Sequence, residues 1–203
     1  MKTSLSIGLT GGIGSGKTLI TRVFSHLGVP IYKADDMAKN MYSKQEVIEQ
    51  IVSYFGQEVI VDGMIDKKKL ASIVFKSPRQ LRLLSDIVHP LVKADYELWK
   101  NKQDKPYVIM ESAIIYESNW QNMFDKVICV FTPKEIAIKR VIKRDNITRG
   151  EVLDRMKNQK NEGDKKNLSD YVIVHDNNKM LIPQILSIHQ QLIDLSQRNI
   201  SQK

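Results

Sequence analysis

The residues best suited to chemistry lie near the N-terminus, where eight consecutive positions fit the pattern G-x-x-x-x-G-K-[ST]. Glycines at this spacing let backbone N–H groups turn towards phosphate oxygens, and the helix that follows adds the positive end of its dipole. We expect Lys17 to reach the β- and γ-phosphates of a nucleoside triphosphate, and Thr18 to bind Mg²⁺. The segment therefore predicts a site for a nucleoside triphosphate. Its members are Gly11, Gly12, Ile13, Gly14, Ser15, Gly16, Lys17 and Thr18.

One acidic residue, Asp35, is placed to act on a hydroxyl that would accept the phosphate. It follows residues 29–32, which predict a short strand, and open parallel sheets bind ligands beyond the carboxyl ends of their strands. There Asp35 could accept or orient the hydroxyl proton, and it could also hold Mg²⁺ through a water molecule. The alternative is that Asp35 caps a helix that begins near Asp36.

Two arginines, Arg140 and Arg144, stand one helical turn apart in a predicted helix. A phosphoryl group in transfer needs positive charge around its oxygens, and a mobile segment can deliver arginines as the site closes. We therefore interpret Arg140 and Arg144, with Lys17, as catalytic. The alternative is that the two arginines form surface ion pairs with Asp145 and Asp154.

The elements that must position these residues alternate between two patterns. Short apolar runs predict strands, and apolar residues at three- and four-residue spacing predict helices between them. This alternation is typical of an α/β fold with a parallel sheet flanked by helices. The predicted strands cover 5–10, 29–32, 107–110, 126–131 and 171–174, and helices are predicted after the phosphate loop, at 134–144 and at 151–159.

Residues 36–104 have the pattern of a mostly helical insertion. Because proline inside a helical pattern breaks or kinks the helix, we expect a break or a kink at His89-Pro90. His89 at this point is more typical of a hinge or cap residue than of a catalyst. One turn and two helix starts are also expected, at Asp62-Gly63, at Asp66 and near Ser77-Pro78.

The composition indicates a folded protein built on one core with a large insertion: 203 residues, of which 42% are hydrophobic and 27% charged. The apolar runs are far shorter than the roughly 20 residues that cross a bilayer, and no export signal is visible. The one cysteine, Cys129, lies in an apolar run typical of a buried side chain. We therefore expect a cytoplasmic protein without a membrane partner, and a frayed tail after Gln197.

The net charge of +8 indicates an anionic partner. Residues 139–166 contain ten Lys and Arg against five Asp and Glu, which favours a local anion site; the alternative is a solvated helix face. Aromatic residues make up only 7% of the chain and are not interleaved with this run. A nucleic-acid partner is therefore not expected.

Several classes of protein share the phosphate loop. A guanine-nucleotide switch would read its base with N-K-x-D, but the match at 101–104 follows a helical pattern and no D-x-x-G occurs. A motor or AAA-type ATPase would need an acidic pair at a strand end, where only Glu111 stands. A small-molecule kinase fits best, with an RNA-associated ATPase as the alternative.

Further motifs follow the loop in order along the chain. Together with residues 8–18 they resemble the dephospho-coenzyme A kinase family over almost the whole length. The resemblance implies ATP-dependent phosphorylation of the ribose 3′-hydroxyl of dephospho-coenzyme A, and the alternative is another metabolite kinase whose acceptor is a nucleoside, a nucleotide or a sugar acid. The motifs are Ala34-Asp35, Ile87-Val88-His89-Pro90, residues 111–118, Lys143-Arg144-Asp145, Arg155 and Gln159.

The resemblance also implies how a single P-loop kinase domain is divided. Residues 1–35, 105–143 and 169–198 would form the nucleotide-binding core, residues 36–104 a substrate-binding insertion, and residues 144–168 a lid over ATP. The oligomeric state stays open.

Three positions depart from the usual family pattern. Lys33 replaces the first acid of a common Asp-Ala-Asp, so Asp35 alone would carry the acidic role. Ala113 replaces a proline ahead of Glu117, which could bind Mg²⁺ through water or pair with an arginine of the lid. His175 stands where an asparagine often helps to hold adenine, so we take His175 as the candidate for that contact.

Overall fold

The computed structural model describes residues 4–74 and 77–201, with side chains as far as residue 198. The chain divides into two compact units. The first unit consists of Met1–Lys33 together with Lys100–Lys203, and the second is Ala34–Trp99. The second unit corresponds to the predicted helical insertion, 36–104, but begins two residues earlier and so includes Asp35.

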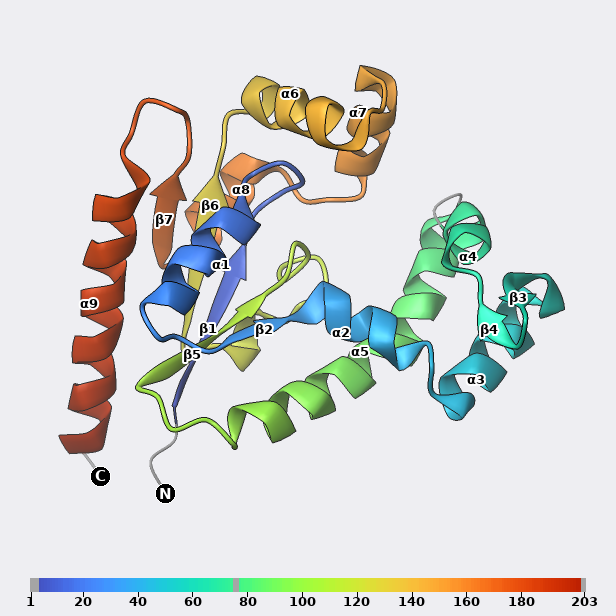
Figure 1. Ribbon diagram of the computed structural model, residues 1–203, viewed down its shortest axis with the longest axis horizontal. Coiled ribbons are helices and arrows are strands. Elements are labelled where there is room, and N and C mark those ends of the chain that lie inside the picture. The colour runs from blue at the N-terminus through green and yellow to red at the C-terminus, as the bar shows by residue number, and fades with distance from the viewer. Residues whose placement is uncertain (1–3, 75–76, 202–203) are drawn as a thin grey trace. The chain divides into compact units, whose positions relative to one another are not determined.

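A five-stranded parallel sheet forms the centre of the first unit (Figure 1). The α/β fold with a parallel sheet flanked by helices is therefore confirmed, and three strands have the predicted bounds. The strand expected at 29–32 is displaced towards Lys33, and β5 ends on Glu111. In spatial order the strands are β2 (Ile31–Lys33), β5 (Tyr107–Glu111), β1 (Leu5–Thr10), β6 (Lys126–Phe131) and β7 (Tyr171–Val174).

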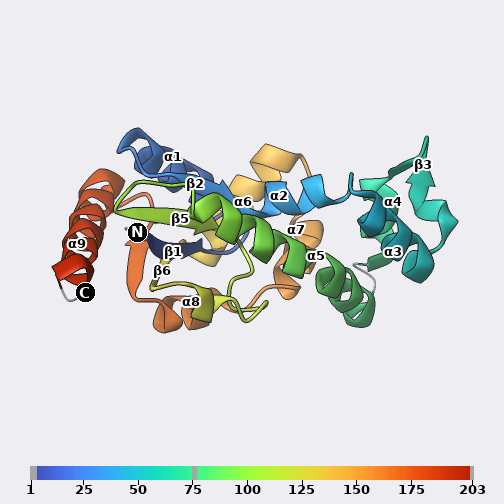
Figure 2. The same cartoon turned by 90° about the horizontal axis from the view of Figure 1, so that it is seen from below.

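Helices cover both faces of this sheet (Figure 2). The helices α1 (Lys17–His26) and α9 (Leu181–Ser201) contact each other and share one hydrophobic core with the strands. Helix α8 (Glu162–Leu168) packs against β6, and Figure 2 shows it on the side of the sheet away from α1. Because both faces are covered, β5, β6 and β7 are largely apolar runs.

Only a small residue fits in the middle of β1, the strand that leads into the phosphate loop. Ile7 and Leu9 are fully buried in the core with α1 and α9, and Gly8 faces the other side of the sheet. A Cβ atom on Gly8 would collide with Ile115 and Phe124. The glycine therefore lets the connection between β5 and β6 pack directly on β1.

Two expectations drawn from the apolar runs can be compared with this fold. Cys129 lies in β6 and is buried, as predicted, and burial raises the pKa of its thiol to about 12. The thiol therefore stays protonated near neutral pH. No helix in residues 4–74 and 77–201 combines the length and the apolar character that crossing a membrane requires.

The second unit is mainly helical. The turn predicted at Asp62-Gly63 is present, and both residues have a positive φ, 51° and 75°. It joins a two-stranded hairpin that was not predicted, because strands of two residues are too short to show alternation. The elements are α2 (Ala34–Met41), α3 (Gln45–Phe55), a short 3-10 helix (Gln57–Val59), β3 (Ile60–Val61), β4 (Met64–Ile65), α4 (Lys67–Val74) and α5 (Pro78–Lys100).

Both helix starts predicted in this unit are confirmed. The carboxylate of Asp66 accepts hydrogen bonds from the backbone N–H groups of Lys68 (2.9 Å) and Lys69 (3.2 Å), and so caps α4. Helix α5 begins at Pro78. Proline is well tolerated at the first helical position because the N–H group there has no partner within the helix.

Of the break or kink expected at His89-Pro90, the break is wrong and the kink agrees with the structure. Helix α5 is a single element with Pro90 inside it, and Figure 1 shows the helix bending along its course. Proline removes one backbone hydrogen bond and crowds the preceding turn, which bends a helix without necessarily ending it. His89 therefore lies inside a helix and does not separate two. The helix has buried residues both before and after the proline, namely Leu84, Ile87, Val88, Val92 and Tyr96.

The region of 134–168 contains three helices where two were predicted. The helix expected at 151–159 begins and ends two residues earlier, because Thr148 and Glu151 form a capping box at its start. Helix α8 was missed because its sequence, EGDKKNL, has a single apolar residue. Helix α9 continues to Ser201, so the fraying expected after Gln197 is wrong up to that residue. The first two helices are α6 (Lys134–Asp145) and α7 (Arg149–Lys157).

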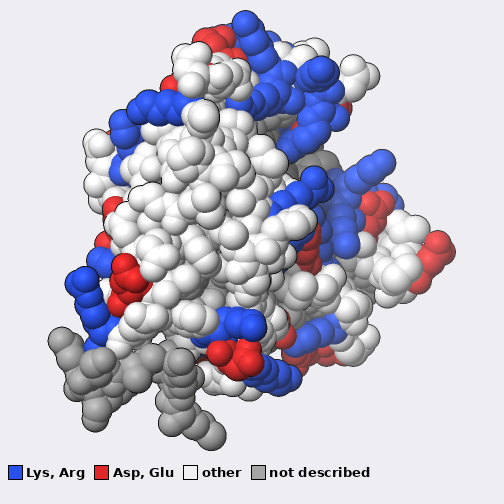
Figure 3. Space-filling view, turned by 60° about the vertical axis from the view of Figure 1, so that its left-hand side comes forward, with Lys and Arg blue, Asp and Glu red and all other residues white. Residues whose placement is uncertain are grey.

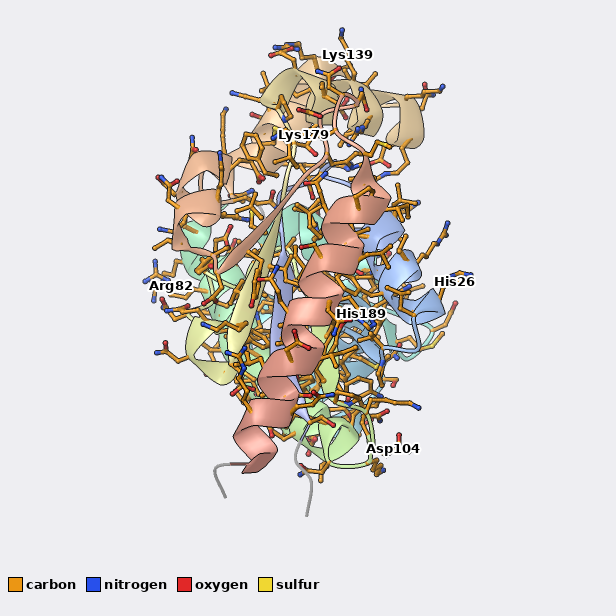
Figure 4. All side chains as sticks on the ribbon, turned by 90° about the vertical axis from the view of Figure 1, so that its left-hand side faces the viewer. His26, Arg82, Asp104, Lys139, Lys179 and His189 are labelled. Atoms are coloured by element: carbon orange, nitrogen blue, oxygen red, sulfur yellow. The ribbon has the colours of Figure 1, made fainter. Side chains whose placement is uncertain are left out.

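A partly buried contact between the sheet and α9 predicts a dependence of stability on pH. The hydroxyl of Tyr107 lies 2.5 Å from Nδ1 of His189, which is labelled in Figure 4. Burial lowers the pKa of His189, so the unfolded chain binds a proton at this residue more readily than the folded protein does. Stability from this histidine is therefore present above its unfolded pKa of about 6.5, and is lost as the pH falls below that value.

We expect the melting temperature to fall between pH 7.5 and pH 5, and to fall less in His189→Gln. Glutamine can still accept the Tyr107 hydrogen bond but does not titrate. The matched control is His26→Gln, because His26 is exposed and bonds only to its own helix in the described contacts. Equal pH dependence of the melting temperature in wild type and His189→Gln would contradict the assignment.

Candidate active site

The phosphate-loop pattern forms the connection between β1 and α1. Gly11, Gly14 and Gly16 have positive φ values of 150°, 78° and 96°, a backbone conformation that glycine adopts without strain. A Cβ atom on Gly16 would also collide with the ring of His175, and one on Gly14 with the backbone oxygen of Ala137. Glycine is thus required both by the course of the loop and by its neighbours.

The loop leads directly into α1, whose first residue is Lys17. Gly16 occupies the N-cap position and offers no side chain to the first N–H groups of α1. The helix therefore directs backbone donors and the positive end of its dipole at the loop. Lys17 lies across the loop, where its Nζ donates to the backbone oxygens of Gly11 (2.8 Å) and Gly12 (3.3 Å). Thr18, in the same turn, is exposed. The arrangement is suited to binding phosphate oxygens.

A carboxylate that the sequence analysis did not assign lies beside this helix. Glu111 ends β5 next to β1, and its Oε2 accepts a hydrogen bond from the hydroxyl of Thr21 at 3.2 Å. The Thr21 hydroxyl also lies 3.2 Å from the backbone oxygen of Thr18. The sequence carries a signal for Glu111, because an acidic residue directly follows an apolar run.

Arg140 projects from α6 towards Gly16 of the phosphate loop. Its guanidinium donates to Nδ1 of His175 (3.0 Å), to the backbone oxygen of His175 (3.4 Å) and to Oδ1 of Asn177 (2.7 Å). Nδ1 of His175 also lies 3.0 Å from the backbone oxygen of Ser15. The structure therefore brings Arg140 and His175 to the loop that the sequence assigned to phosphate.

The ring of His175 lies between a hydrogen-bond donor and an acceptor. Its Nδ1 is 3.0 Å from the Arg140 guanidinium, which can only donate, and 3.0 Å from the backbone oxygen of Ser15, which can only accept. The oxygen of Ser15 is satisfied separately by the hydroxyl of Thr132 at 2.9 Å. Burial first, and then the charge of Arg140, lower the pKa of His175. His175 is therefore a neutral support for the loop at neutral pH.

Arg144 has a different partner from Arg140, although both belong to α6. Its Nε and one terminal nitrogen bond to the two carboxylate oxygens of Asp145, at 2.7 and 3.0 Å. Arg155 of α7 bonds to the same carboxylate at 2.9 Å, and the two arginines lower the pKa of Asp145. The ion pair with Asp145 is thus formed, whereas Asp154 pairs with Lys157. In this structure Arg144 is therefore held by its neighbour Asp145.

Glu117 pairs with lysines in the described contacts. Its Oε1 lies 2.8 Å from Nζ of Lys165, which also donates to the backbone oxygen of Ala113 at 2.8 Å. The same Oε1 accepts from the backbone N–H of Lys160 at 2.7 Å. Lys165 is fully buried, so losing one partner would leave a buried charge uncompensated. Glu117 therefore anchors α8, and the alternative of an arginine partner is not observed among these contacts.

Two further side chains of this region reach the phosphate loop. Oε1 of Gln159 accepts from the backbone N–H of Ile13 at 2.9 Å. The carboxylate of Glu162, at the start of α8, accepts from the backbone N–H of Gly12. Gln159 belongs to a recognised motif, but nothing in the sequence predicts that Glu162 contacts a loop about 150 positions away.

Asp35 lies in the other unit. It is exposed in the first turn of α2, which begins at Ala34. The cap proposed for a helix beginning near Asp36 is therefore wrong, although an acidic residue in a first turn still favours the helix through its dipole. All the other predicted site residues belong to the first unit.

The basic run of 139–166 forms part of the surface of the first unit. Figure 3 shows Lys and Arg side chains gathered at the top of the molecule, where Figure 1 places α6 and α7. Some of these charges are neutralised locally, as in the pair of Arg149 with Glu135 at 2.8 Å. The remainder favours an anionic ligand.

Comparisons with known proteins agree with this site. The family model described as dephospho-CoA kinase matches residues 5–181. The chain is 34% identical to a dephospho-CoA kinase of Bacteroides fragilis over 187 residues, 91% of each chain. It is 35% identical to that of Fusobacterium nucleatum over 173 residues, 85% of this chain and 90% of the relative.

Two solved structures resemble the whole chain. The crystal structure of TT1252 from Thermus thermophilus has a TM-score of 0.82 at 27% identity, and covers 95% of this chain and 98% of its own. The dephospho-CoA kinase from Campylobacter jejuni has a TM-score of 0.66 at 25% identity, with 96% and 98% covered. The phosphate loop, the parallel sheet behind it and a family match that spans both units together show that the chain belongs to the dephospho-CoA kinase family.

Proposed function

We propose that this chain transfers the γ-phosphoryl group of ATP to the ribose 3′-hydroxyl of dephospho-CoA, which gives CoA and ADP. The observation that carries the proposal is the family match over residues 5–181, which includes the phosphate loop, both arginines of α6 and the whole second unit. Residues 36–104 would hold the acceptor, and residues 144–168 would form the lid over ATP.

The loop and the arginines would bind and stabilise the transferring group. Backbone N–H groups of Gly11–Thr18 and the Lys17 ammonium are the proposed ligands of the phosphates. Arg140 lies beside Gly16 of the loop and Arg144 would swing from Asp145, so both could add positive charge where it develops in the transition state. His175, which supports the loop, would border the nucleotide.

The oxygen donors beside α1 fit Mg²⁺. Among the described residues no group of three or more His, Cys, Asp or Glu could hold a metal ion by itself. Mg²⁺ characteristically takes only one or two protein oxygens, and completes its shell with substrate phosphates and water. The Thr18 hydroxyl is the proposed ligand, with Glu111 or Asp35 acting through water. The ion would neutralise charge on the β- and γ-phosphate oxygens.

Asp35 is the proposed partner of the acceptor hydroxyl. As the 3′-oxygen bonds to the γ-phosphorus, the bond from that phosphorus to the bridging oxygen of ADP breaks, and the hydroxyl proton is left to be taken up. A carboxylate can orient the hydroxyl and accept that proton. The neighbouring Lys33, at the end of β2, leaves Asp35 as the only acid of the Lys33-Ala34-Asp35 segment.

The proposed function is tested by ADP release over a panel of acceptors. We expect dephospho-CoA to stimulate ADP formation strongly, and nucleosides, nucleotides, a sugar acid and RNA to leave it near the rate with water alone. Stimulation by another small alcohol would favour a different metabolite kinase, and stimulation by RNA would favour the ATPase alternative.

Asp35→Asn should lower kcat with dephospho-CoA by about 10²–10³-fold, the lower part of the range for losing a general base, because a loose phosphoryl transition state needs little help from one. Binding of ATP and the melting temperature should hardly change. The matched control is Asp36→Asn, since Asp36 shares the first turn of α2 and pairs with Lys39 at the surface. A kcat within threefold of wild type would remove Asp35 from the catalytic group.

A further inference from the structure

The first two N–H groups after Gly11 in the phosphate loop bond to side chains of the proposed lid. The N–H of Gly12 donates to the Glu162 carboxylate, and the N–H of Ile13 donates to the Gln159 amide oxygen at 2.9 Å. A Cβ atom on Gly12 would collide with the Glu162 carboxylate, so the glycine permits this close approach. Figure 1 shows α8 beside the loop.

The position of the Glu162 carboxylate beside the loop is energetically unfavourable in part. Its Oε2 is buried and has no hydrogen-bond partner among the described atoms. Burial raises the pKa of Glu162, the charges of Lys165 and Lys17 lower it, and the charge of Glu117 raises it. A carboxylate with one unsatisfied buried oxygen is stabilised less than one in water, so a competing ligand can displace it.

We propose that Glu162 is a nucleotide-displaced residue, whose carboxylate competes with a phosphate of ATP for the N–H of Gly12. This inference rests on the proposed binding of ATP at the loop. Carboxylate and phosphate oxygens accept hydrogen bonds from the same backbone donors. Both are negatively charged, so the two groups repel each other and cannot occupy the same N–H donor together. Binding of ATP therefore moves Glu162, and with it the start of α8, away from the loop. Nucleotide binding is in this way coupled to the lid.

Gln159 can be compared with Glu162, because it also accepts a hydrogen bond from a backbone N–H of the loop but carries no charge. If competition is electrostatic, removing the charge at 162 strengthens ATP binding, whereas adding a charge at 159 weakens it. A merely structural role predicts something else: both exchanges would loosen the contact between lid and loop, and both would change affinity in the same direction.

The test is the dissociation constant of ATP with Mg²⁺, measured by titration calorimetry without an acceptor. We expect Glu162→Ala to bind ATP about tenfold more tightly than wild type, since even one like charge at a partly buried site is worth a factor of this order. Gln159→Glu should bind ATP about tenfold more weakly. Unchanged or weaker binding by Glu162→Ala would overturn the inference.

The control is Asp164→Asn, because Asp164 lies in the same helix but is exposed, and this variant should bind ATP as wild type does. If Glu162→Ala does not fold, the isosteric Glu162→Gln is measured with the same expectation of tighter binding and the same criterion.

The assay separates the two proposals. Wild type that binds ATP but does not phosphorylate dephospho-CoA contradicts the proposed function, whereas full turnover with unchanged affinity in the Glu162 variants contradicts only the inference.

Discussion

Lys17→Ala is expected to lower kcat/KM with dephospho-CoA by about 10⁴-fold, within the range for removing a cation that stabilises a transferring phosphoryl group. This corresponds to about 5 kcal/mol of transition-state stabilisation. The structure gives the reason: Nζ of Lys17 lies over the loop, 2.8 Å from the oxygen of Gly11. No other lysine of α1 could replace it, since the helix has none.

The measurement is steady-state ADP formation, with a melting curve to show that the variant is folded. Lys126→Ala is the control, because Lys126 forms an ion pair with Asp170 at the far end of β6, and this variant should keep its activity. A folded Lys17→Ala protein with turnover near that of wild type would rule out the phosphate-loop interpretation.

Arg144→Ala is expected to lower kcat by about 10³-fold, as when an arginine that stabilises the transition state is removed. In the structure its guanidinium bonds to Asp145 and its side chain is 62% exposed. An exposed ion pair contributes little to stability, so the melting temperature should hardly change. The large loss of rate would arise because the arginine leaves Asp145 and contacts the phosphoryl group in the transition state.

The matched control is Arg149→Ala. Arg149 also forms a two-point ion pair at the surface, with Glu135 at 2.8 Å, and it belongs to the next helix. Loss of this pair should leave kcat within about twofold, because surface pairs contribute little. A change in KM for ATP alone in Arg144→Ala would make Arg144 a residue of ground-state binding. Equal losses in both variants would indicate a general effect on the lid.

Local features of this protein could be predicted from its sequence. The phosphate loop is defined by the φ angles that its glycines allow and by consecutive N–H groups, so eight adjacent residues contain nearly all of its information. The strand at 126–131 is buried on both faces and is therefore an apolar run with clear ends, and the strand at 171–174 is a short apolar run with the predicted bounds. Asp66 caps α4 through bonds to N–H groups two and three positions away. Each of these features depends on neighbours within a few residues.

The contacts that complete the site were decided only by tertiary structure. Arg140 and Arg144 look equivalent in the sequence, yet one bonds to His175, 35 residues away, and the other to its neighbour Asp145. The difference arises because β7 pairs with β6, and the residue that follows β7 is thereby placed beside the loop. Glu162 reaches Gly12 for a similar reason, since α8 packs on β6. No periodicity predicts such contacts, because the order of strands in the sheet, and not spacing along the chain, determines which side chains meet.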